Sequence, residues 1–596
     1  MNRFFSATAR NGLGLVTAAL VSFLALGPQL PPPGHAGSAL LPVVVSASDE
    51  AGAQTAAHSL IRSGGTVSRN LALINGFAGL APSWALAPLA ALSDVRSVTP
   101  NASMHPLGAT YAPTTDVGSL YNTAGITGAR AMWAKGYTGE GVDIALIDTG
   151  IAPVEGLTTP GKVVNGASIS FDSQAANLIY LDAYGHGTHM AGIIAGRDAT
   201  AIAGHYATDT TSFLGIAPDA RLISVKVGDL TGATDVSQVI AGIDWVVQHQ
   251  HDNGMNIRLI NLSFGTDSTQ GYIRDPLAFA AEQAWKAGIT VVVSAGNDGQ
   301  AAAGLADPAF DPTLLAVGAV DTNGSLKLSK HTVAAFSDYG SANRGPDVVA
   351  PGVHIASLNV PGSFIDVKFG TAGVVGTGGR FLRGSGTSEA AAVTTGAAAL
   401  LLQEHPRATP DQIKDLLVSS ANRLEDVSRA SQGHGEISLR DAAEAELTHE
   451  RQTFTRSTGA GSLELSRGTH HLTVGGVTLS GEKDIFGAAW NSAAIAAAEA
   501  AHTAWTGGVF NGNSWSGNSW SGNSWSGNSW SGNSWSGNSW SGNSWSGNSW
   551  SGNSWSGNSW SGNSWSGNSW SGNSWSGNSW SGNSWSGNSW SGNSWS

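Results

Sequence analysis

The chain has 596 residues, enough for several domains and a large hydrophobic core. Its formal net charge is −13, with 42 acidic against 29 basic residues, which argues against nucleic acid as a partner. It contains no cysteine, so disulfides, thiol nucleophiles and thiolate metal sites are excluded.

The N-terminus resembles a secretory signal peptide. Arg3 and Arg10 precede an uncharged apolar run over residues 13–27, which is shorter than the roughly 20 residues of a membrane-spanning helix. Small residues at 34–36 offer a cleavage site. We therefore expect a signal peptide over residues 1–36 and a protein that is secreted or associated with the cell surface. An uncleaved membrane anchor is the alternative.

Residues 40–100 have the pattern of a small α+β unit. Apolar spacing predicts the order strand, helix, strand, strand, helix, strand. This order fits a ferredoxin-like sandwich. By itself such a fold indicates no function.

From Val142 onward, short apolar runs alternate with helical patterns. This alternation predicts a parallel sheet with helices on both faces. The run 142–147 ends at Asp148, and the run 289–294 is followed by Asn297. Ligands bind beyond the carboxyl ends of the strands in such sheets, so Asp148 and Asn297 are candidate site residues.

Two glycine-rich motifs carry further candidate side chains. Gly185-His186-Gly187-Thr188-His189 leaves room around His186 and runs into an apolar helix. Gly386-Thr387-Ser388 delivers a hydroxyl at a helix start, where free N–H groups and the helix dipole favour negative charge. Two other interpretations of the histidines stay open: a metal site shared by His186 and His189, or a packed His189 inside the helix.

Together these motifs resemble the subtilisin-like serine peptidases, the subtilases. Asp148-Thr149-Gly150, the His186 motif, Ser294-Ala295-Gly296-Asn297 and the Ser388 motif occur in the order found in that family. The resemblance covers about residues 137–443. It implies an α/β fold with a parallel sheet of the seven-stranded subtilisin type.

The resemblance also implies a role for each motif. A serine hydroxyl is a weak nucleophile, so His186 would take the proton of Ser388 while Asp148 orients the imidazole ring. Asn297 would donate a hydrogen bond to the oxyanion. An extended polypeptide substrate would pair with the main chain of nearby segments. The substrate-binding residues implied in this way are Gly232, Ser263, Phe264 and Gly265.

The sequence departs from the family pattern near the nucleophile. Glu389 stands where Met is usual, and Ala392-Val393 replaces the usual Pro-His. A carboxylate at 389 is expected to raise the pKa of His186. Residues 358–379 form a longer segment than usual, which we expect to overhang the site. No metal ligand and no required cofactor are predicted, while the resemblance leaves calcium open.

The same resemblance suggests a domain organisation. Residues 37–108 would be a propeptide that assists folding and blocks the active site, with cleavage between residues 104 and 111. Residues 109–446 would be the catalytic domain. Residues 447–511 are expected to form a linker or small C-terminal module, with a strand near 463–465 and an alanine-rich helix.

The tail over residues 512–596 is 85 residues of Gly-Asn-Ser-Trp-Ser, or seventeen copies (85/5). Three interpretations stay open. The tail is a flexible spacer, a stacked solenoid, or an aromatic surface that binds polysaccharide or the cell wall.

The sequence therefore predicts a secreted serine endopeptidase made as a self-processed zymogen. Its expected partners are a polypeptide substrate, its own propeptide and, through the tail, a cell-wall or polysaccharide surface. One alternative is an inactive surface adhesion protein built on a peptidase fold. Another is an acid-adapted relative of the sedolisin type, against which His186 and Asn297 count.

Overall fold

We analysed a computed structural model of the chain. The residues that the structure describes are 40–101, 112–174, 178–299, 304–341, 344–374, 376–449, 451–474, 477–506 and 509–516, with the backbone of short strands between 519 and 582. The predicted signal peptide over residues 1–36 and the predicted cleavage site between residues 104 and 111 lie outside these residues. The chain forms two compact units, Met1–Pro106 and Leu107–Ser596, which are described separately.

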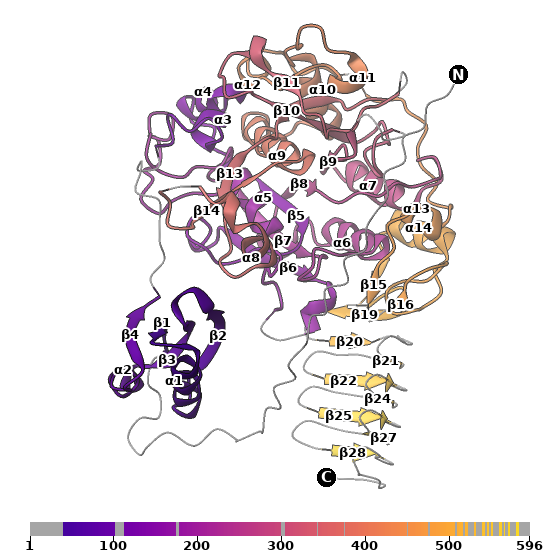
Figure 1. The fold of residues 1–596 in the computed structure, drawn as a ribbon. Helices are drawn as coiled ribbons and strands as arrows, with labels where there is room; N and C mark the ends of the chain where they lie inside the picture. The colour runs from indigo at the N-terminus through magenta and orange to yellow at the C-terminus, as the bar shows by residue number, and fades with distance from the viewer. Residues whose placement is uncertain are drawn as a thin grey trace, which may run out of the picture. The chain divides into compact units, whose positions relative to one another are not determined.

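The first unit is a four-stranded antiparallel sheet with two helices (Figure 1). Its elements are β1 (Leu40–Ala47), α1 (Glu50–Arg62), β2 (Thr66–Leu71), β3 (Gly76–Pro82), α2 (Leu86–Ala90) and β4 (Val95–Pro100). Asp49 caps α1 by accepting a hydrogen bond from Gly52 N at 2.8 Å. Val45, Leu60 and Phe77 pack together in the core. The strand order β2-β3-β1-β4 is that of a ferredoxin-like sandwich, so the predicted element order is confirmed.

The second unit is built on an eight-stranded sheet, in which seven strands are parallel and β11 is antiparallel. The strands are β6 (Val163–Ser168), β7 (Arg221–Lys226), β5 (Asp143–Asp148), β8 (Ile257–Leu262), β9 (Thr290–Ser294), β10 (Leu315–Asp321), β12 (Val348–Pro351) and β11 (Thr332–Val333). Every residue of β5, β9 and β12 is buried, as expected when helices cover both faces. The predicted α/β fold class is confirmed.

Two long helices deliver candidate site residues to this sheet. α5 (His186–Ala195) and α9 (Thr387–Glu404) pack against each other and against the sheet. α6 (Val236–Gln248) and α7 (Pro276–Lys286) form a second packed pair (Figure 1). Other helices of this unit are α3 (Leu120–Thr127), α4 (Ala129–Ala134), α10 (Pro410–Ser419), α11 (Arg429–Gln432) and α12 (Leu439–Ala442).

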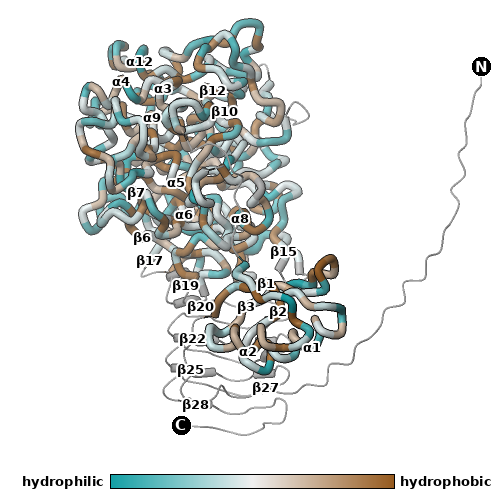
Figure 2. Tube along the Cα trace, turned by 60° about the vertical axis from the view of Figure 1, so that its left-hand side comes forward, coloured by the Kyte–Doolittle hydropathy of each residue, from teal (hydrophilic) through white to brown (hydrophobic). Residues whose placement is uncertain are grey.

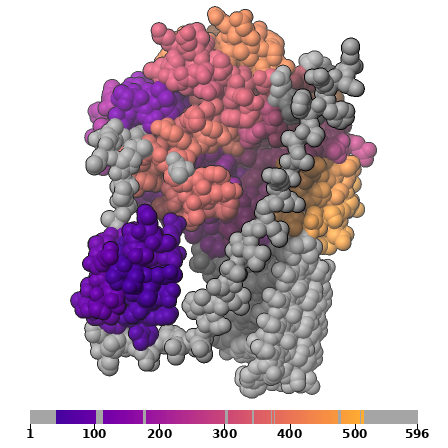
Figure 3. Space-filling view, viewed as in Figure 1, coloured from indigo at the N-terminus to yellow at the C-terminus, as the bar shows by residue number. Residues whose placement is uncertain are grey.

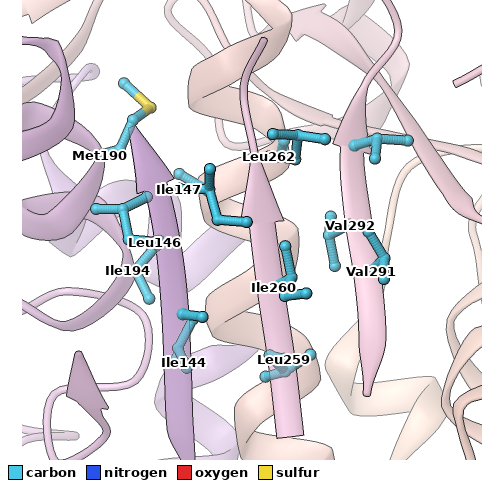
Figure 4. Close-up of a cluster of buried hydrophobic side chains, with 14 of the residues drawn as sticks. Ile144, Leu146, Ile147, Met190, Ile194, Leu259, Ile260, Leu262, Val291 and Val292 are labelled. Carbon is cyan, nitrogen blue, oxygen red and sulfur yellow. The ribbon is translucent and has the colours of Figure 1, made fainter. Parts of the chain in front are cut away.

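The core of the second unit lies where β5, β8 and β9 run side by side. Figure 4 shows Ile147 of β5, Ile260 of β8 and Val291 of β9 in this layer, with Met190 and Ile194 of α5 beside β5. These five side chains are all fully buried. Hydrophobic segments gather inside the domain and hydrophilic loops lie at its surface (Figure 2). The carboxyl ends of these strands, where the candidate site residues lie, are therefore supported by a close-packed hydrophobic core.

The described parts of residues 451–513, called the C-terminal segment below, pack directly on the α/β domain (Figure 3). The segment contains α13 (Leu463–Arg467), β15 (Thr473–Val474), β16 (Val477–Thr478), α14 (Ser492–Ala500), β17 (Trp505–Thr506), β18 (Val509–Phe510) and the start of β19 (Asn513–Ser516). Leu463, Trp490 and Phe510 belong to the same hydrophobic cluster as the central sheet. The strand expected near 463–465 is wrong, because Ser462 accepts a hydrogen bond from Leu465 N and starts a helix there.

The repeat tail contains short strands whose pairing repeats. Trp530 pairs in parallel with Trp550, and Trp550 with Trp570, so partners lie 20 residues apart (550 − 530). Trp545 and Trp565 follow the same rule. Four copies of the five-residue repeat thus separate partners, which is the pattern of the stacked interpretation. Within the described parts of the chain, no helix combines the length and hydrophobicity that crossing a bilayer requires.

Candidate active site

Asp148 and His186 meet at the carboxyl edge of the sheet. Asp148 is the last residue of β5 and is fully buried, and His186 is the first residue of α5. Nδ1 of His186 lies 2.8 Å from Oδ1 and 3.0 Å from Oδ2 of Asp148. The backbone N–H of Thr149 donates to the same carboxylate at 2.8 Å. The pair can therefore hold the imidazole in one orientation and stabilise its charged form.

The surroundings of His186 favour its protonated form. Burial alone lowers the pKa of the ring, but the charge and hydrogen bond of Asp148, with the charges of Glu389 and Asp182, outweigh it and raise the pKa to about 9. The effect of Glu389 has the direction expected from the sequence. The His186 side chain is 23% exposed, so solvent still reaches the ring.

Asp182 organises the loop before His186, a role that the sequence analysis missed. Its buried carboxyl accepts hydrogen bonds from Gly185 N at 2.6 Å, Thr188 N at 2.7 Å and Thr149 Oγ1 at 2.8 Å. Burial raises the pKa of Asp182 against the effect of these donors. The carboxyl thus ties the end of β5 to the start of α5. Its place four residues before His186 was the only signal in the sequence.

Ser388 and Asn297 are brought together at the start of α9. Ser388 is the second residue of that helix and is 7% exposed. Oδ1 of Asn297 accepts a hydrogen bond from Thr387 N at 2.9 Å, which places the Asn297 amide beside the turn that carries Ser388. No described residue accepts a hydrogen bond from Nδ2 of Asn297. The N–H groups at the helix start likewise have no helical partner.

Gly296 allows the turn that carries Asn297 to come close to the start of α9. Its φ of +115° is strained for other residues, and a Cβ there would lie 1.9 Å from Oδ2 of Asp338. Asp338 in turn accepts from the N–H groups of Asp298 at 2.6 Å and Gly299 at 2.8 Å. The hydrogen bonds to Asp338 therefore hold the turn after β9 in place, and Asn297 lies at the exposed tip of this turn.

The starts of α5 and α9 are close neighbours. Glu389, which follows Ser388, places Oε1 at 3.9 Å from Nε2 of His189, one turn after His186. Among the described residues, Ser388 Oγ makes no hydrogen bond to the His186 ring. Catalytic hydrogen bonds are commonly long before substrate binds, so this spacing is compatible with proton transfer in a complex.

His189 is a buried histidine rather than one half of a pair open to a metal. Burial and the neighbouring His186 lower the pKa of His189 to about 3, so its ring is neutral. Burial raises the pKa of Glu389. His186 already uses Nδ1 for Asp148, and His189 faces Glu389. Within the described residues, no three His, Cys, Asp or Glu side chains converge on a metal position.

The segments expected to bind substrate border this centre. A Cβ at Gly232 would lie 2.7 Å from the ring of Tyr184, so the loop containing Gly232 packs on the residue two positions before His186. A Cβ at Gly228 would lie 2.7 Å from Thr149 and 3.2 Å from the tip of Phe264. Phe264 therefore approaches the residue that follows Asp148. Ser263 and Gly265 flank it at the end of β8, with Ser263 Oγ accepting from Asn261 Nδ2 at 3.1 Å.

The long segment 358–379 lies beside the loop that leads to His186. It follows β13 (Ile355–Leu358), contains α8 (Phe364–Phe369) and precedes β14 (Phe381–Gly384). The N–H groups of Phe364 and Ile365 donate to the carbonyls of Ala183 and Tyr184, both at 3.0 Å. The Tyr184 and Phe364 rings stack with centroids 5.4 Å apart. The segment thus covers one flank of the site.

Comparison with known proteins identifies a family to which the chain is similar. The model of the subtilase family matches residues 139–435. The chain is 35% identical over 311 residues to serine protease AprX of Bacillus subtilis, covering 51% of this chain and 66% of that protein. It is 33% identical over 300 residues to subtilisin DY of Bacillus licheniformis, covering 50% of this chain and 90% of that protein.

The chain belongs to the subtilase family. As a subtilase it is a subtilisin-like serine endopeptidase, a hydrolase. A similar solved structure is that of a cold adapted subtilisin-like serine proteinase, with 27% identity, a TM-score of 0.36, and coverage of 51% of this chain and 88% of that one. The C-terminal segment and the repeat tail lie outside the part matched by the family model.

Proposed function

We propose that this subtilase cleaves polypeptides through an Asp148–His186–Ser388 triad and an acyl-enzyme. The observation that carries the proposal is the hydrogen-bonded pair of buried Asp148 and His186, placed beside the helix start that bears Ser388. The neutral His186 ring accepts the hydroxyl proton as Ser388 Oγ attacks the scissile carbonyl. Asp148 stabilises the imidazolium that forms.

The charge that develops on the carbonyl oxygen needs donors already in place. Nδ2 of Asn297 supplies one, because Oδ1 is held by Thr387 N. The N–H of Ser388 supplies the second from the first turn of α9. The imidazolium then gives its proton to the leaving amine, and a water attacks the acyl-enzyme by the same route in reverse. Replacing Asn297 by Ala is expected to lower kcat roughly 10²–10³-fold, a value that comes from this family.

The substrate is proposed to lie as an extended strand between two segments. Gly232 contributes one segment, and Ser263, Phe264 and Gly265 contribute the other. Both border the Asp148–His186 pair, which supports this placement. A strand held on both sides presents its scissile carbonyl to Ser388 in a fixed register.

We also propose that the protein is made as a secreted zymogen. Residues 1–36 would direct secretion, and residues 37–108 would act as the propeptide. The ferredoxin-like unit over residues 40–100 is compact by itself, which supports a separable folding assistant. Parallel sheets depend on non-local contacts and fold slowly, so an assistant is physically reasonable. The tail over residues 512–596 would hold the enzyme at a polysaccharide or cell-wall surface.

One pair of variants tests the catalytic proposal. Ser388→Ala should lower kcat for a chromogenic peptide by about 10⁶-fold, whereas the matched Ser420→Ala, at the C-cap that follows α10, should retain activity. Mass spectrometry of the secreted products should show the propeptide still attached in Ser388→Ala. Full activity of that variant would overturn the triad, and its normal maturation would overturn self-processing.

A further inference from the structure

The repeat tail contains two kinds of strand pairing, although its units are identical in sequence. In the first two units, β19 pairs with β20 (Ser519–Ser521) in antiparallel fashion, so Trp515 lies opposite Trp520. Farther along the tail, Trp530 pairs in parallel with Trp550. The same sequence therefore forms a hairpin at the start of the tail and parallel strands after it, so something other than the repeat sequence has to select between them.

The strand β20 belongs to both arrangements. It contacts β22 (Ser539–Gly542), which begins 20 residues later (539 − 519). β22 in turn pairs in parallel with β25 (Ser559–Gly562), again 20 residues later (559 − 539). The parallel part of the tail thus continues from β20 with the spacing that it keeps afterwards.

The repeats by themselves leave the register of this stack open. A shift of one strand by a whole repeat, or five residues, brings an identical residue to every position. Strands that are rich in glycine and polar on both faces also specify their register weakly. A contact from outside the repeats is therefore needed to fix where the first strand lies.

Asp484 of the C-terminal segment makes such a contact with the first repeat. Its Oδ2 accepts hydrogen bonds from Nδ2 of Asn513 at 2.7 Å and from Nδ2 of Asn511 at 2.8 Å. Its Oδ1 accepts from Phe486 N at 2.9 Å and Ala488 N at 3.0 Å. Asp484 is fully buried and Asn513 is 2% exposed. All four partners are donors, which is the set that an ionised carboxylate accepts.

The strand that precedes the first repeat is fixed to the α/β domain. Phe510 of β18 lies opposite Asn513 of β19 in an antiparallel pair. The Phe510 ring is fully buried, with its centroid 5.5 Å from that of Trp505. Nε1 of Trp505 donates to the carbonyl of Ala241 in α6 at 2.9 Å. The first repeat therefore extends a pair of strands that already packs on α6.

The loop that carries Asp484 is fixed to α6 by a second route. Arg467 is fully buried and forms an ion pair with Asp235, the N-cap of α6, at 2.7 Å. The same guanidinium donates to the carbonyls of Gly481 at 2.7 Å and Lys483 at 2.5 Å. Lys483 directly precedes Asp484. The carboxyl that binds Asn513 thus has a fixed position on the α/β domain.

We propose that the C-terminal segment is a cap for the repeat tail, in which Asp484 binds the side-chain amide of Asn513 and sets the register in which the later repeats stack. The ligand of this site is the first Gly-Asn-Ser-Trp-Ser unit of the same chain. Stacked repeats generally need a terminal unit of different structure, and the hairpin of β19 and β20 on the C-terminal segment supplies it. The inference goes beyond the proposed peptidase activity and does not depend on it.

Pairs of introduced cysteines test the register, because the chain has no cysteine of its own. Ser531 pairs with Ser551, so Ser531→Cys with Ser551→Cys reports the observed register. Ser531→Cys with Ser556→Cys reports a slip by one repeat, since these positions lie 25 residues apart (556 − 531). Oxidised glutathione is added to the full-length protein at pH 8, and the free thiols left on the monomer are counted. The 531–551 pair should cross-link about tenfold more than the 531–556 pair, as expected for one hydrogen bond to a charged group.

Two asparagine variants separate the cap from the stack. Asn513→Ala removes the amide that Asp484 binds and should bring the two cross-linking yields to within about twofold of each other, because that hydrogen bond is lost. Asn533→Ala removes the same amide from an internal repeat and should keep the preference for the 531–551 pair. Asp484→Asn changes the opposite partner of the contact and should behave like Asn513→Ala, which keeps the test open if one variant does not fold.

The outcomes decide between the cap and its alternatives. An unchanged preference in both Asn513→Ala and Asp484→Asn would show that Asp484 does not set the register. Equal losses in Asn513→Ala and Asn533→Ala would place the role of the amide inside the stack and would also overturn the cap. Absence of both cross-links in the chain with Asn513 intact would overturn the register itself. Hydrolysis of a chromogenic peptide, measured on the same samples, reports the peptidase activity separately.

Discussion

Buried carboxyl groups have opposite surroundings in two regions of this molecule. At the active site, the carboxylate of Asp148 meets an imidazole ring and a backbone N–H. Where the C-terminal segment packs on the α/β domain, buried carboxyls face other carboxyls. Asp244 of α6 and Glu499 of α14 are both 2% exposed, and burial raises the pKa of each well above its usual value.

The same arrangement recurs along that interface. Burial, with the neighbouring charge of Asp311, raises the pKa of Glu282 to about 8, and Glu282 accepts a hydrogen bond from Ser457 N at 2.9 Å. Ser466 Oγ lies 3.1 Å from a carboxyl oxygen of Asp275 and 3.0 Å from one of Asp307. The active site pairs a buried carboxylate with an imidazole ring, whereas at the interface burial raises the pKa of several neighbouring carboxyls, close to the ion pair of Arg467 with Asp235. Rising pH should therefore favour catalysis while it weakens the interface.

The largest expected change in kcat comes from a variant that removes the charge of Asp148 at the active site. Asp148→Asn keeps the shape of the side chain but removes its charge and can present an N–H to Nδ1 of His186. We expect kcat to fall roughly 10⁴-fold because the wrong tautomer is held. Steady-state kinetics on a chromogenic peptide measure this, with thermal unfolding as the check on folding. A loss below tenfold would show that Asp148 does not orient the base.

Arg467→Met tests a fully buried ion pair at the interface, that of Arg467 with Asp235. Removing the guanidinium leaves the carboxylate of Asp235 buried without its partner, which costs about 3–5 kcal/mol in unfolding free energy. Denaturant unfolding measures it. The double variant Arg467→Met, Asp235→Asn should recover part of the loss, because no unpaired charge remains. If the single and double variants are equally stable, the buried charge is not the cause.

Asp244→Asn tests the acid pair at the interface. Folded-state pKa values above the unfolded ones mean that the folded protein holds more protons, so stability is fully present at low pH and is lost as pH rises through the folded values. For Glu282 this window runs from about 4.5 to about 8. We expect the wild-type melting temperature to fall between pH 5 and pH 8, and Asp244→Asn to lessen the fall.

Asp252→Asn, an exposed acidic residue, is the matched control and should keep the wild-type pH slope. Hydrogen exchange of residues 492–500 at both pH values should locate the change in α14. Equal slopes in wild type and Asp244→Asn would contradict a protonated pair.

Glu389→Gln is expected to have the smallest effect. The general base must be neutral, so with a His186 pKa of about 9 the value of kcat/KM should rise with pH toward that midpoint. Losing the charge of Glu389 should move the midpoint to lower pH. The control Glu140→Gln changes the net charge equally at an exposed position and should leave the midpoint in place. A midpoint that does not move would show that Glu389 is already neutral in the resting enzyme.

The sequence predicted the central fold well because its signals are local. Apolar runs such as 142–147 and 289–294 became buried strands, and the motifs around His186 and Ser388 became helix starts. The C-terminal segment was harder to predict. Its helix α13 depends on one cap at Ser462, and its packing depends on contacts such as Arg467 with Asp235, which are 232 residues apart in the chain.

The candidate site also combines residues that local motifs predict with residues that depend on contacts distant along the chain. The residues proposed to carry the chemistry were predicted from short motifs, whereas the residues that hold them in place were not. Asp182 acts through three donors on separate residues, and Tyr184 acts by packing on Gly232. Neither contact follows from spacing along the chain, because both depend on how loops meet after the sheet has formed.

Labelling with a fluorophosphonate tests the central claim most directly. The reagent reacts with a serine only when a neighbouring base activates it. Peptide mapping of the mature wild type at pH 8 should find one adduct, on the peptide that contains Ser388, and His186→Ala should carry none. An unlabelled wild type, or equal labelling of Ser388 in His186→Ala, would contradict the account.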